Sequence, residues 1–297
     1  MTRLWNSAAG LLLATGGLLG LTPLFGKLAA QGGVGAPLWA FVVSFGAAVV
    51  LLCALLARRG RVGLTPRRLR YFAATAAISY AIPNLLMFSA IPHLGAGYTG
   101  VMFTLSPVFT LGLSILFRQR RPNALGIAGI AVGFAGAVMV AATRGEAGQP
   151  AEPLWVAAGL LIPVCLAAGN IYRTLDWPEG AGPIELAVGS NLASAAMLLA
   201  GMLVTGAGGP VASLAGAPLP LVVLGQVAAA SGMFALFFRL QAVGGPVYLS
   251  QIGYVAAAVG LVFGVAILGE RYQAMTWAGA VVITVGVLMT TRAQGRG

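Results

Sequence analysis

Hydrophobic residues gather in long, almost uninterrupted blocks along the chain, and short polar segments separate the blocks. The blocks have the length of a helix that crosses a bilayer, about 17–25 residues. They predict ten transmembrane helices, at residues 6–28, 37–57, 69–91, 96–117, 123–142, 154–175, 183–205, 218–240, 246–268 and 275–291. The sequence contains no series of roughly ten-residue segments that alternate in polarity, which a transmembrane β-barrel would need. The pattern therefore predicts an all-α integral membrane protein.

Composition supports a lipid bilayer as the surroundings of this chain. Of its 297 residues 59% are hydrophobic and only 8% are charged, and the mean hydropathy is +0.93. Soluble domains carry about 25% charged residues. The net charge of +11 could indicate a nucleic-acid partner, but the arginines lie in short loops between apolar blocks. We therefore expect no nucleic-acid partner.

The arginines of the short loops predict the orientation, because cytoplasmic loops of membrane proteins are rich in Arg and Lys. With a cytoplasmic N-terminus, 14 of the 17 basic residues fall on the inner side: Arg3, Arg58, Arg59, Arg61, Arg67, Arg68, Arg70, Arg118, Arg120, Arg121, Arg173, Arg239, Arg292 and Arg296. Lys27, Arg144 and Arg271 fall outside. An even number of spans then places the C-terminus in the cytoplasm as well. We see no organelle signal and expect a bacterial inner membrane.

The two halves of the chain resemble each other. The polar stretch 140–153 divides the spans five and five, which predicts one unit at residues 1–145 and a second at 146–297. The segment 95–121 aligns with 245–271 at a constant offset, so that Gly95 meets Gly245. Because five is odd, the two copies must insert in opposite directions. Inverted repeats are an architecture of secondary transporters, in which the halves exchange conformations to alternate access to a central site.

Short motifs carry a family resemblance over nearly the whole chain. "LSP" at 105–107 and "LGER" at 268–271 resemble the EamA-type branch of the drug/metabolite transporter superfamily. "GNIYRTLDWPEG" (169–180) and "NLLMFSAIPHLGAGYTG" (84–100) are similar to the YddG-like exporters of aromatic and other amino acids. The chain departs from the family pattern where Arg120 aligns with Glu270. The resemblance implies ten helices whose first, third, fourth and sixth spans help to enclose a central cavity.

Four prolines interrupt predicted spans. Pro107 has no N–H and clashes with the carbonyl of the residue four positions earlier. The backbone groups that it frees must face protein or a wet cavity, because lipid cannot satisfy them. Pro23, Pro83 and Pro163 occupy the first, third and sixth spans. Each proline is a candidate kink, and the sequence leaves open whether the kink is fixed or acts as a moving hinge.

Polar side chains inside the spans are the candidate ligands for a solute, since they are costly in lipid and favour the interior. We predict a substrate-binding set of Tyr80, Asn84, Ser106, Asn170, Gln251 and Tyr254. For each of them a helix–helix hydrogen bond is the alternative role. Amide, hydroxyl and aromatic groups suit a small zwitterion with an apolar side chain, and aromatic faces also attract cations.

Missing residue types restrict the mechanism. No Asp or Glu lies deep inside a predicted span, and His93, the only histidine, is expected at the outer rim. Proton exchange on a membrane carboxylate is therefore not expected. Lys27 is the only cation near the predicted cavity, and we expect it to extend to the outer surface, as lysines near span ends do. Together these features predict export of small-molecule amino acids, aromatic and other apolar ones, by alternating access without proton coupling.

Several alternatives remain open. The protein could instead export other small amphipathic metabolites or drugs, with or without proton coupling, or form a solute channel. An enzyme is not expected, because the spans show no nucleophile with a base, no paired aspartates and no metal cluster. With two cysteines and one histidine we expect no metal and no cofactor. The small-residue face made by Gly126, Gly129, Gly133 and Gly136 predicts close helix packing, inside a monomer or across a weak dimer.

Overall fold

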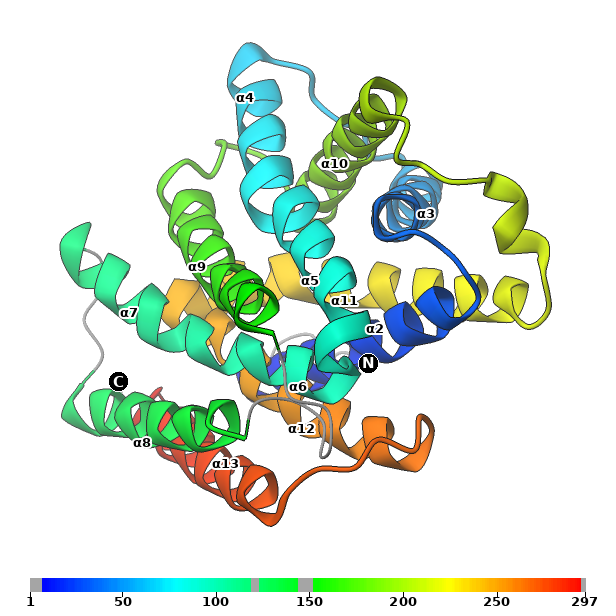
Figure 1. Ribbon diagram of the computed structural model, residues 1–297. Helices are drawn as coiled ribbons and strands as arrows, with labels where there is room; N and C mark the ends of the chain where they lie inside the picture. The colour runs from blue at the N-terminus through cyan, green and yellow to red at the C-terminus, as the bar shows by residue number, and fades with distance from the viewer. Residues whose placement is uncertain (1–6, 119–122, 144–151, 295–297) are drawn as a thin grey trace.

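The computed structural model describes residues 7–118, 123–143 and 152–294, and every regular element among them is helical (Figure 1). The predicted positions Arg3, Arg120, Arg121, Arg144 and Arg296, and the boundary at 145/146, lie outside the described residues. The elements are α2 (Ala8–Gln31), α3 (Ala36–Ala57), α4 (Pro66–Thr75), the π-helix η1 (Ala76–Ala81), α5 (Ile82–Leu94), α6 (Ala96–Val101), the 3-10 helix η2 (Met102–Leu105), α7 (Ser106–Leu116), α8 (Ala124–Ala141), α9 (Pro153–Leu175), α10 (Pro183–Thr205), the 3-10 helix η3 (Val211–Ala215), α11 (Leu219–Ser250), α12 (Ile252–Ala266) and α13 (Ala274–Gln294).

Each predicted apolar block lies on helical structure. The third predicted span is the continuous stretch α4–η1–α5, and the fourth is α6–η2–α7. In the described part of the chain seven helical stretches are long and apolar enough to cross a membrane. Shorter apolar stretches occupy α8, α12 and α13. The all-α prediction is confirmed, and the helices are those of a multi-pass membrane protein.

Two glycines with positive φ end helical segments at corresponding positions of the two halves. Gly95 has φ 81° and separates α5 from α6, and Gly245 has φ 71° inside α11. Glycine adopts such backbone angles at little steric cost because it has no Cβ. The helix α11 is kinked at Gly245. The predicted spans 218–240 and 246–268 therefore run in different directions, although they follow each other closely in the sequence.

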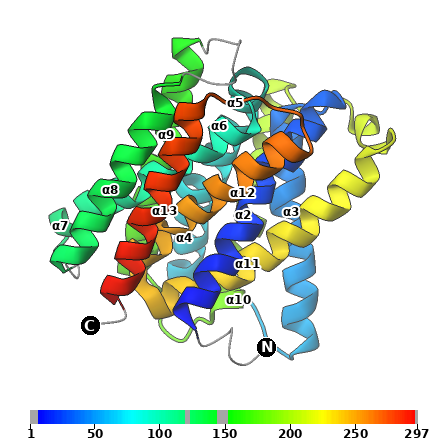
Figure 2. The same cartoon turned by 90° about the horizontal axis from the view of Figure 1, so that it is seen from below.

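Helices α8 and α13 pack side by side and antiparallel. The Asn123 amide at the start of α8 donates to the carbonyl of Ala293 at the end of α13 over 3.1 Å. The Thr143 and Thr276 hydroxyls, at the opposite ends of the same two helices, lie 3.2 Å apart. The two helices therefore contact each other along their whole length, as Figures 1 and 2 show.

Glycines make this close approach possible. A Cβ on Gly136 would lie 2.7 Å from the carbonyl oxygen of Gly279, and one on Gly286 would lie 2.5 Å from the backbone nitrogen of Gly133. The small-residue face of α8 is thus occupied by α13 of the same chain. Gly133 and Gly136 thus have the intramolecular role that the sequence predicted as one of two, and the dimer contact stays a prediction.

The bundle core lies where α2, α3, α5, α9, α10 and α11 meet, and its largest apolar cluster draws side chains from all of them. Figure 2 shows the start of α2 and the end of α13 at the same side of the bundle, and the α12–α13 connection at the opposite side. These two sides carry the two polar clusters described next.

Candidate functional site

A cavity lies in the middle of the bundle, between helices from both halves of the chain. Its walls come from α2, α3, η1, α5, η2, α7, α9, α11 and α12. None of the described residues that line it is charged. The lining is mainly apolar and aromatic, with Thr22, Ser79, Tyr80, Asn84, Ser106, Asn170 and Ser250 as its polar members. Such a cavity, apolar with a few placed polar groups, is typical of a small-molecule site.

Four of the six predicted binding residues line this cavity. Tyr80 and Asn84 reach it from η1 and α5, Ser106 from α7, and Asn170 from α9. Tyr80 and Asn84 are four residues apart, which places them on one helix face. Their contact with a solute stays a prediction.

The other two predicted residues do not line the cavity. Tyr254 is buried in a separate cluster beside α8, where its hydroxyl would lie 2.5 Å from a Cβ on Gly133. The predicted span 246–268 puts Gln251 and Tyr254 on one helix, but the helix is not continuous there. α11 ends at Ser250 and α12 begins at Ile252. Gln251, the residue between them, is buried but not part of the lining.

The predicted kink prolines lie at or beside changes of helix type. Pro83 occupies the first turn of α5 directly after the π-helix η1, and Pro107 the first turn of α7 directly after the 3-10 helix η2. Pro23 and Pro163 lie within α2 and α9. π-Helical turns are rare and concentrate at functional sites. The two irregular segments carry the cavity residues Ser79, Tyr80 and Phe103.

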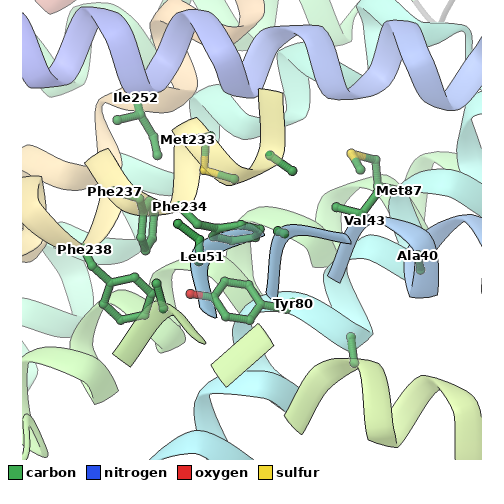
Figure 3. Close-up of a cluster of buried hydrophobic side chains, with 14 of the residues drawn as sticks. Ala40, Val43, Leu51, Tyr80, Met87, Met233, Phe234, Phe237, Phe238 and Ile252 are labelled. Carbon is green, nitrogen blue, oxygen red and sulfur yellow. The ribbon is translucent and has the colours of Figure 1, made fainter. Parts of the chain in front are cut away.

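Aromatic rings form one wall of the cavity. The ring of Tyr80 meets that of Phe234 edge-on, with centroids 4.8 Å apart. Figure 3 shows Tyr80 with its hydroxyl turned towards the side where Phe237 and Phe238 lie. Phe237 and Phe238 also meet edge-on, at 5.7 Å. The Tyr80 hydroxyl is buried and has no hydrogen-bond partner among the described residues.

Arg173, near the end of α9, is the residue that sequence reasoning misplaced. It was counted among the cytoplasmic loop arginines, yet its side chain is fully buried. Its Nε donates to Gln241 Oε1 over 2.7 Å, its Nη2 to Asn170 Oδ1 over 2.6 Å, and its Nη1 to the Ser79 hydroxyl. Its guanidinium carbon lies 4.7 Å from the centre of the Phe237 ring.

The signal that could have identified Arg173 is its spacing from Asn170. Residues three apart on a helix are neighbours on its surface, so a buried Asn170 brings Arg173 towards the interior. The expectation that Lys27 is the only cation near the cavity was wrong for this reason. The lining is neutral, but a guanidinium lies directly behind it.

Glu270 forms a second polar cluster at the other side of the bundle. Lys27 Nζ lies 2.5 Å from Glu270 Oε1, so the prediction that Lys27 extends to the outer surface was wrong. The backbone N–H of Ala96 donates to Oε1 over 2.8 Å and that of Gly97 to Oε2 over 3.1 Å. The Tyr272 hydroxyl donates to Oε2 as well. The carboxylate thus holds α2, the start of α6 and the α12–α13 loop together.

The environment of Glu270 favours its charged form. Burial alone would raise the pKa of this carboxyl, but the hydrogen bonds from Lys27, Tyr272 and the Ala96 backbone outweigh burial and lower the pKa below its ordinary value. The first N–H groups of a helix also carry partial positive charge. Glu270 is therefore an ionised, fully paired structural anchor.

Two further ion pairs involve arginines in the first half of α4. Arg68 donates to Glu185 over 2.6 Å, and Arg70 donates to Asp176 over 2.9 Å. Asp176 also accepts a hydrogen bond from the Tyr172 hydroxyl over 2.7 Å. His93 stacks on the ring of Trp155 at 4.0 Å, away from the cavity lining. In the described part of the chain, no group of His, Cys, Asp and Glu is arranged to hold a metal ion.

Comparison with known proteins gives a family match within the first half of the chain and a similar fold over nearly the whole of it. Residues 6–142 match the EamA-like transporter family. Among solved structures, one described only as "Crystal structure of protein" has a TM-score of 0.69 over 98% of this chain and 99% of its own, at 18% identity, and therefore shares the fold. No curated protein matches the chain. The match of residues 6–142 to a family of transporters agrees with the multi-pass helical fold.

Proposed function

We propose that this protein exports amino acids, aromatic and other apolar ones, across the bacterial inner membrane by alternating access without proton coupling. The observation that carries the proposal is the central cavity, walled by helices of both halves and lined by uncharged aromatic, apolar and polar side chains. Such a lining suits an apolar side chain, and its few hydroxyl and amide groups suit a polar head. The family match over residues 6–142 supports the transport function.

Inverted repeats allow alternating access because each half can adopt the conformation of the other, and we propose residues 1–145 and 146–297 as such repeats. Three features support this proposal. Helices α8 and α13, the last of each half, pack antiparallel. The hydroxyls of Ser44 and Ser194, which correspond at the offset of the sequence repeat, lie 3.0 Å apart. Gly95 and Gly245, which also correspond, both have positive φ.

The proposed uncoupled mechanism follows from the absence of a carboxylate in the described cavity lining. Glu270 is buried, but Lys27 and three further donors occupy it, and it does not line the cavity. A proton-coupled exporter needs a group that titrates as the site opens and closes. No described lining residue has that property near neutral pH.

Counterflow into liposomes tests the proposal. Vesicles that contain the purified protein and unlabelled phenylalanine should transiently accumulate labelled phenylalanine from outside, and an imposed pH gradient should not drive the uptake. Asn84→Leu should reduce the initial rate at least tenfold, because it removes a polar group from the lining. Glu179→Gln, on an exposed loop, serves as the matched control. Absence of accumulation with phenylalanine, threonine and methionine would refute amino-acid transport.

Fusions to reporters that are active on only one side of the membrane test the orientation. We expect both chain ends to report the cytoplasm, in accord with the start of α2 and the end of α13 lying on one side of the bundle. Opposite locations for the two ends would refute both the orientation and the even number of spans.

A further inference from the structure

The charge of Arg173 has no counter-ion in the described part of the chain. Its three hydrogen-bond acceptors, on Gln241, Asn170 and Ser79, are all neutral. No ion pair of the described residues includes it. The acid nearest in sequence, Asp176, is occupied by Arg70 and Tyr172.

A buried charge without an opposite charge is costly to the fold. Hydrogen bonds to neutral groups and the face of Phe237 offset only part of the lost hydration. Buried charges in proteins are normally paired, and removal of a partner is strongly unfavourable. An isolated buried guanidinium therefore indicates a negative group that is supplied from elsewhere.

The cavity is where such a group would bind. Three of the side chains that contact Arg173, those of Ser79, Asn170 and Phe237, also line the cavity, and they come from three different elements. The guanidinium of Arg173 is thus separated from the cavity only by side chains that contact it directly. Gln241, which does not line the cavity, accepts a hydrogen bond from the guanidinium. The amide nitrogen of Gln241 donates to the carbonyl of Asn170 and to the Thr174 hydroxyl, each over 3.0 Å.

Arg173 also sets the direction of the hydrogen bonds of the two polar lining groups. The Ser79 oxygen accepts from Nη1, so its hydroxyl hydrogen can point only away from the guanidinium. Asn170 accepts from Nη2 through Oδ1, so its Nδ2 group is left to donate, and one of its hydrogens faces the Thr110 hydroxyl at 3.4 Å. Ser79 and Asn170 consequently have hydrogen-bond donors to offer to a ligand, and the positive charge of Arg173 lies next to both of them. Donors of this kind recognise an anionic oxygen, and charge-assisted hydrogen bonds are the stronger ones.

We propose that Ser79 and Asn170 bind the carboxylate of the transported solute, with Arg173 behind them as the positioning residue that supplies the opposite charge. The inference rests on the proposed transport of amino acids and specifies it. The ligand is an organic carboxylate with an apolar tail, and the tail lies against the aromatic wall at Phe234. Neutral amides and esters of the same compounds are poor ligands, and so are amines that lack a carboxylate.

Equilibrium binding to the purified full chain tests the site with defined probes. These are labelled L-phenylalanine, its amide, 3-phenylpropionate and the neutral 3-phenylpropionamide. We expect each acid to bind at least tenfold more tightly than its own amide. If 3-phenylpropionate binds as well as phenylalanine, the carboxylate alone is recognised. Equal affinity of acid and amide in both pairs would overturn the proposal.

Variants at Arg173 separate the proposed role from a purely structural one. Arg173→Gln should abolish the preference for acid over amide, and Arg173→Lys, which keeps the charge, should restore at least part of it. Arg70→Gln removes an arginine from an exposed ion pair at the same side of the bundle and should leave the preference unchanged. If Arg173→Gln does not fold, Ser79→Ala answers the same question, because it should reduce the acid preference without removing the charge. Full retention of the preference in Arg173→Gln, or in Ser79→Ala, would overturn the proposal.

The design distinguishes failure of the site from failure of the proposed function. Binding of 3-phenylpropionate that depends on Arg173, together with no counterflow of any amino acid, would keep the carboxylate site and refute amino-acid export. Counterflow of phenylalanine with unchanged acid preference in Arg173→Gln would keep export and refute the site.

Discussion

Glu270 and Arg173 are both buried and charged, but their surroundings differ. Glu270 accepts from an ammonium, two backbone N–H groups and a hydroxyl, and so has an opposite charge and a full set of donors. Arg173 has three neutral acceptors and an aromatic face. Glu270 lies at one side of the bundle in a loop, whereas Arg173 borders the cavity. The comparison teaches that a paired buried charge serves the fold, and an unpaired one beside a cavity indicates a ligand.

The largest effect on stability should come from removal of the Glu270 charge. Glu270→Gln removes the carboxylate that pairs with Lys27, and loss of one member of a buried pair costs about 3 kcal/mol or more. Denaturant unfolding in detergent measures it. The exposed carboxyl of Glu179 provides the control, since Glu179→Gln should change stability by about 0.5 kcal/mol or less. Equal stability of Glu270→Gln and the wild type would contradict the anchoring role.

Replacement of the other partner should have a smaller effect. Lys27→Met removes the ammonium but leaves Glu270 with hydrogen bonds from Ala96, Gly97 and Tyr272. We expect a loss of about 2 kcal/mol, because hydrogen bonds to a charged group are each worth about 1.5–3 kcal/mol. The double variant with Glu270→Gln should lose less than the sum of the two single losses. Strict additivity would show that the two charges do not interact.

Arg173 should show the opposite balance between stability and function. Arg173→Met removes a charge without a counter-ion, which is favourable, but it also leaves Gln241 and Asn170 without a donor. We therefore expect a stability change within about 1 kcal/mol, together with at least a tenfold loss of phenylalanine counterflow. Unfolding and counterflow on the same preparation measure both. A loss of several kcal/mol with normal counterflow would place Arg173 in the same class as Glu270.

The exposed ion pair between Arg70 and Asp176 should have the smallest effect on the free energy of unfolding. The Arg70 side chain is 67% exposed, and exposed ion pairs contribute about 0.2–1 kcal/mol. Arg70→Gln should therefore lower the free energy of unfolding by about 0.5 kcal/mol or less, and high salt should reduce the difference further. A larger loss would show that Asp176 and Tyr172 form part of the stable core.

Low pH should weaken the Glu270 cluster without any substitution, because it protonates the carboxylate. The pKa of this carboxyl is lowered in the folded protein from its ordinary value of 4.5, so the unfolded chain takes up the proton first as the pH falls. The stabilisation is complete above pH 4.5 and is lost as the pH falls through the lowered pKa. Between pH 8 and pH 5 the cluster should contribute no change. Comparison of the free energies of unfolding of wild type and Glu270→Gln from pH 8 to below pH 4.5 isolates the contribution, and a difference that vanishes already at pH 6 would contradict it.

The positions of the helices were largely predictable from the chain alone. Ten apolar blocks predicted the helical elements, because lipid requires every backbone hydrogen bond to be satisfied within the span. Pro83 and Pro107 marked two changes of helix type, since proline removes a donor wherever it occurs. Tyr80, Asn84, Ser106 and Asn170 were found as lining residues because polar side chains in a span avoid lipid.

What only the tertiary structure decided are the contacts between residues far apart in the sequence. Lys27 and Glu270 are separated by 243 positions, and no local pattern indicates that they meet. The break between α11 and α12 turned Tyr254 away from the cavity, because a short irregular turn changes the angular position of every later residue on the helix. Arg173 was counted with the loop arginines because it lies near the end of a predicted span, but the packing of α9 buries its side chain. The sequence by itself determined the membrane environment and the helices, which depend on local hydrophobicity and backbone hydrogen bonding; the partners of the buried charges depend on how those helices pack.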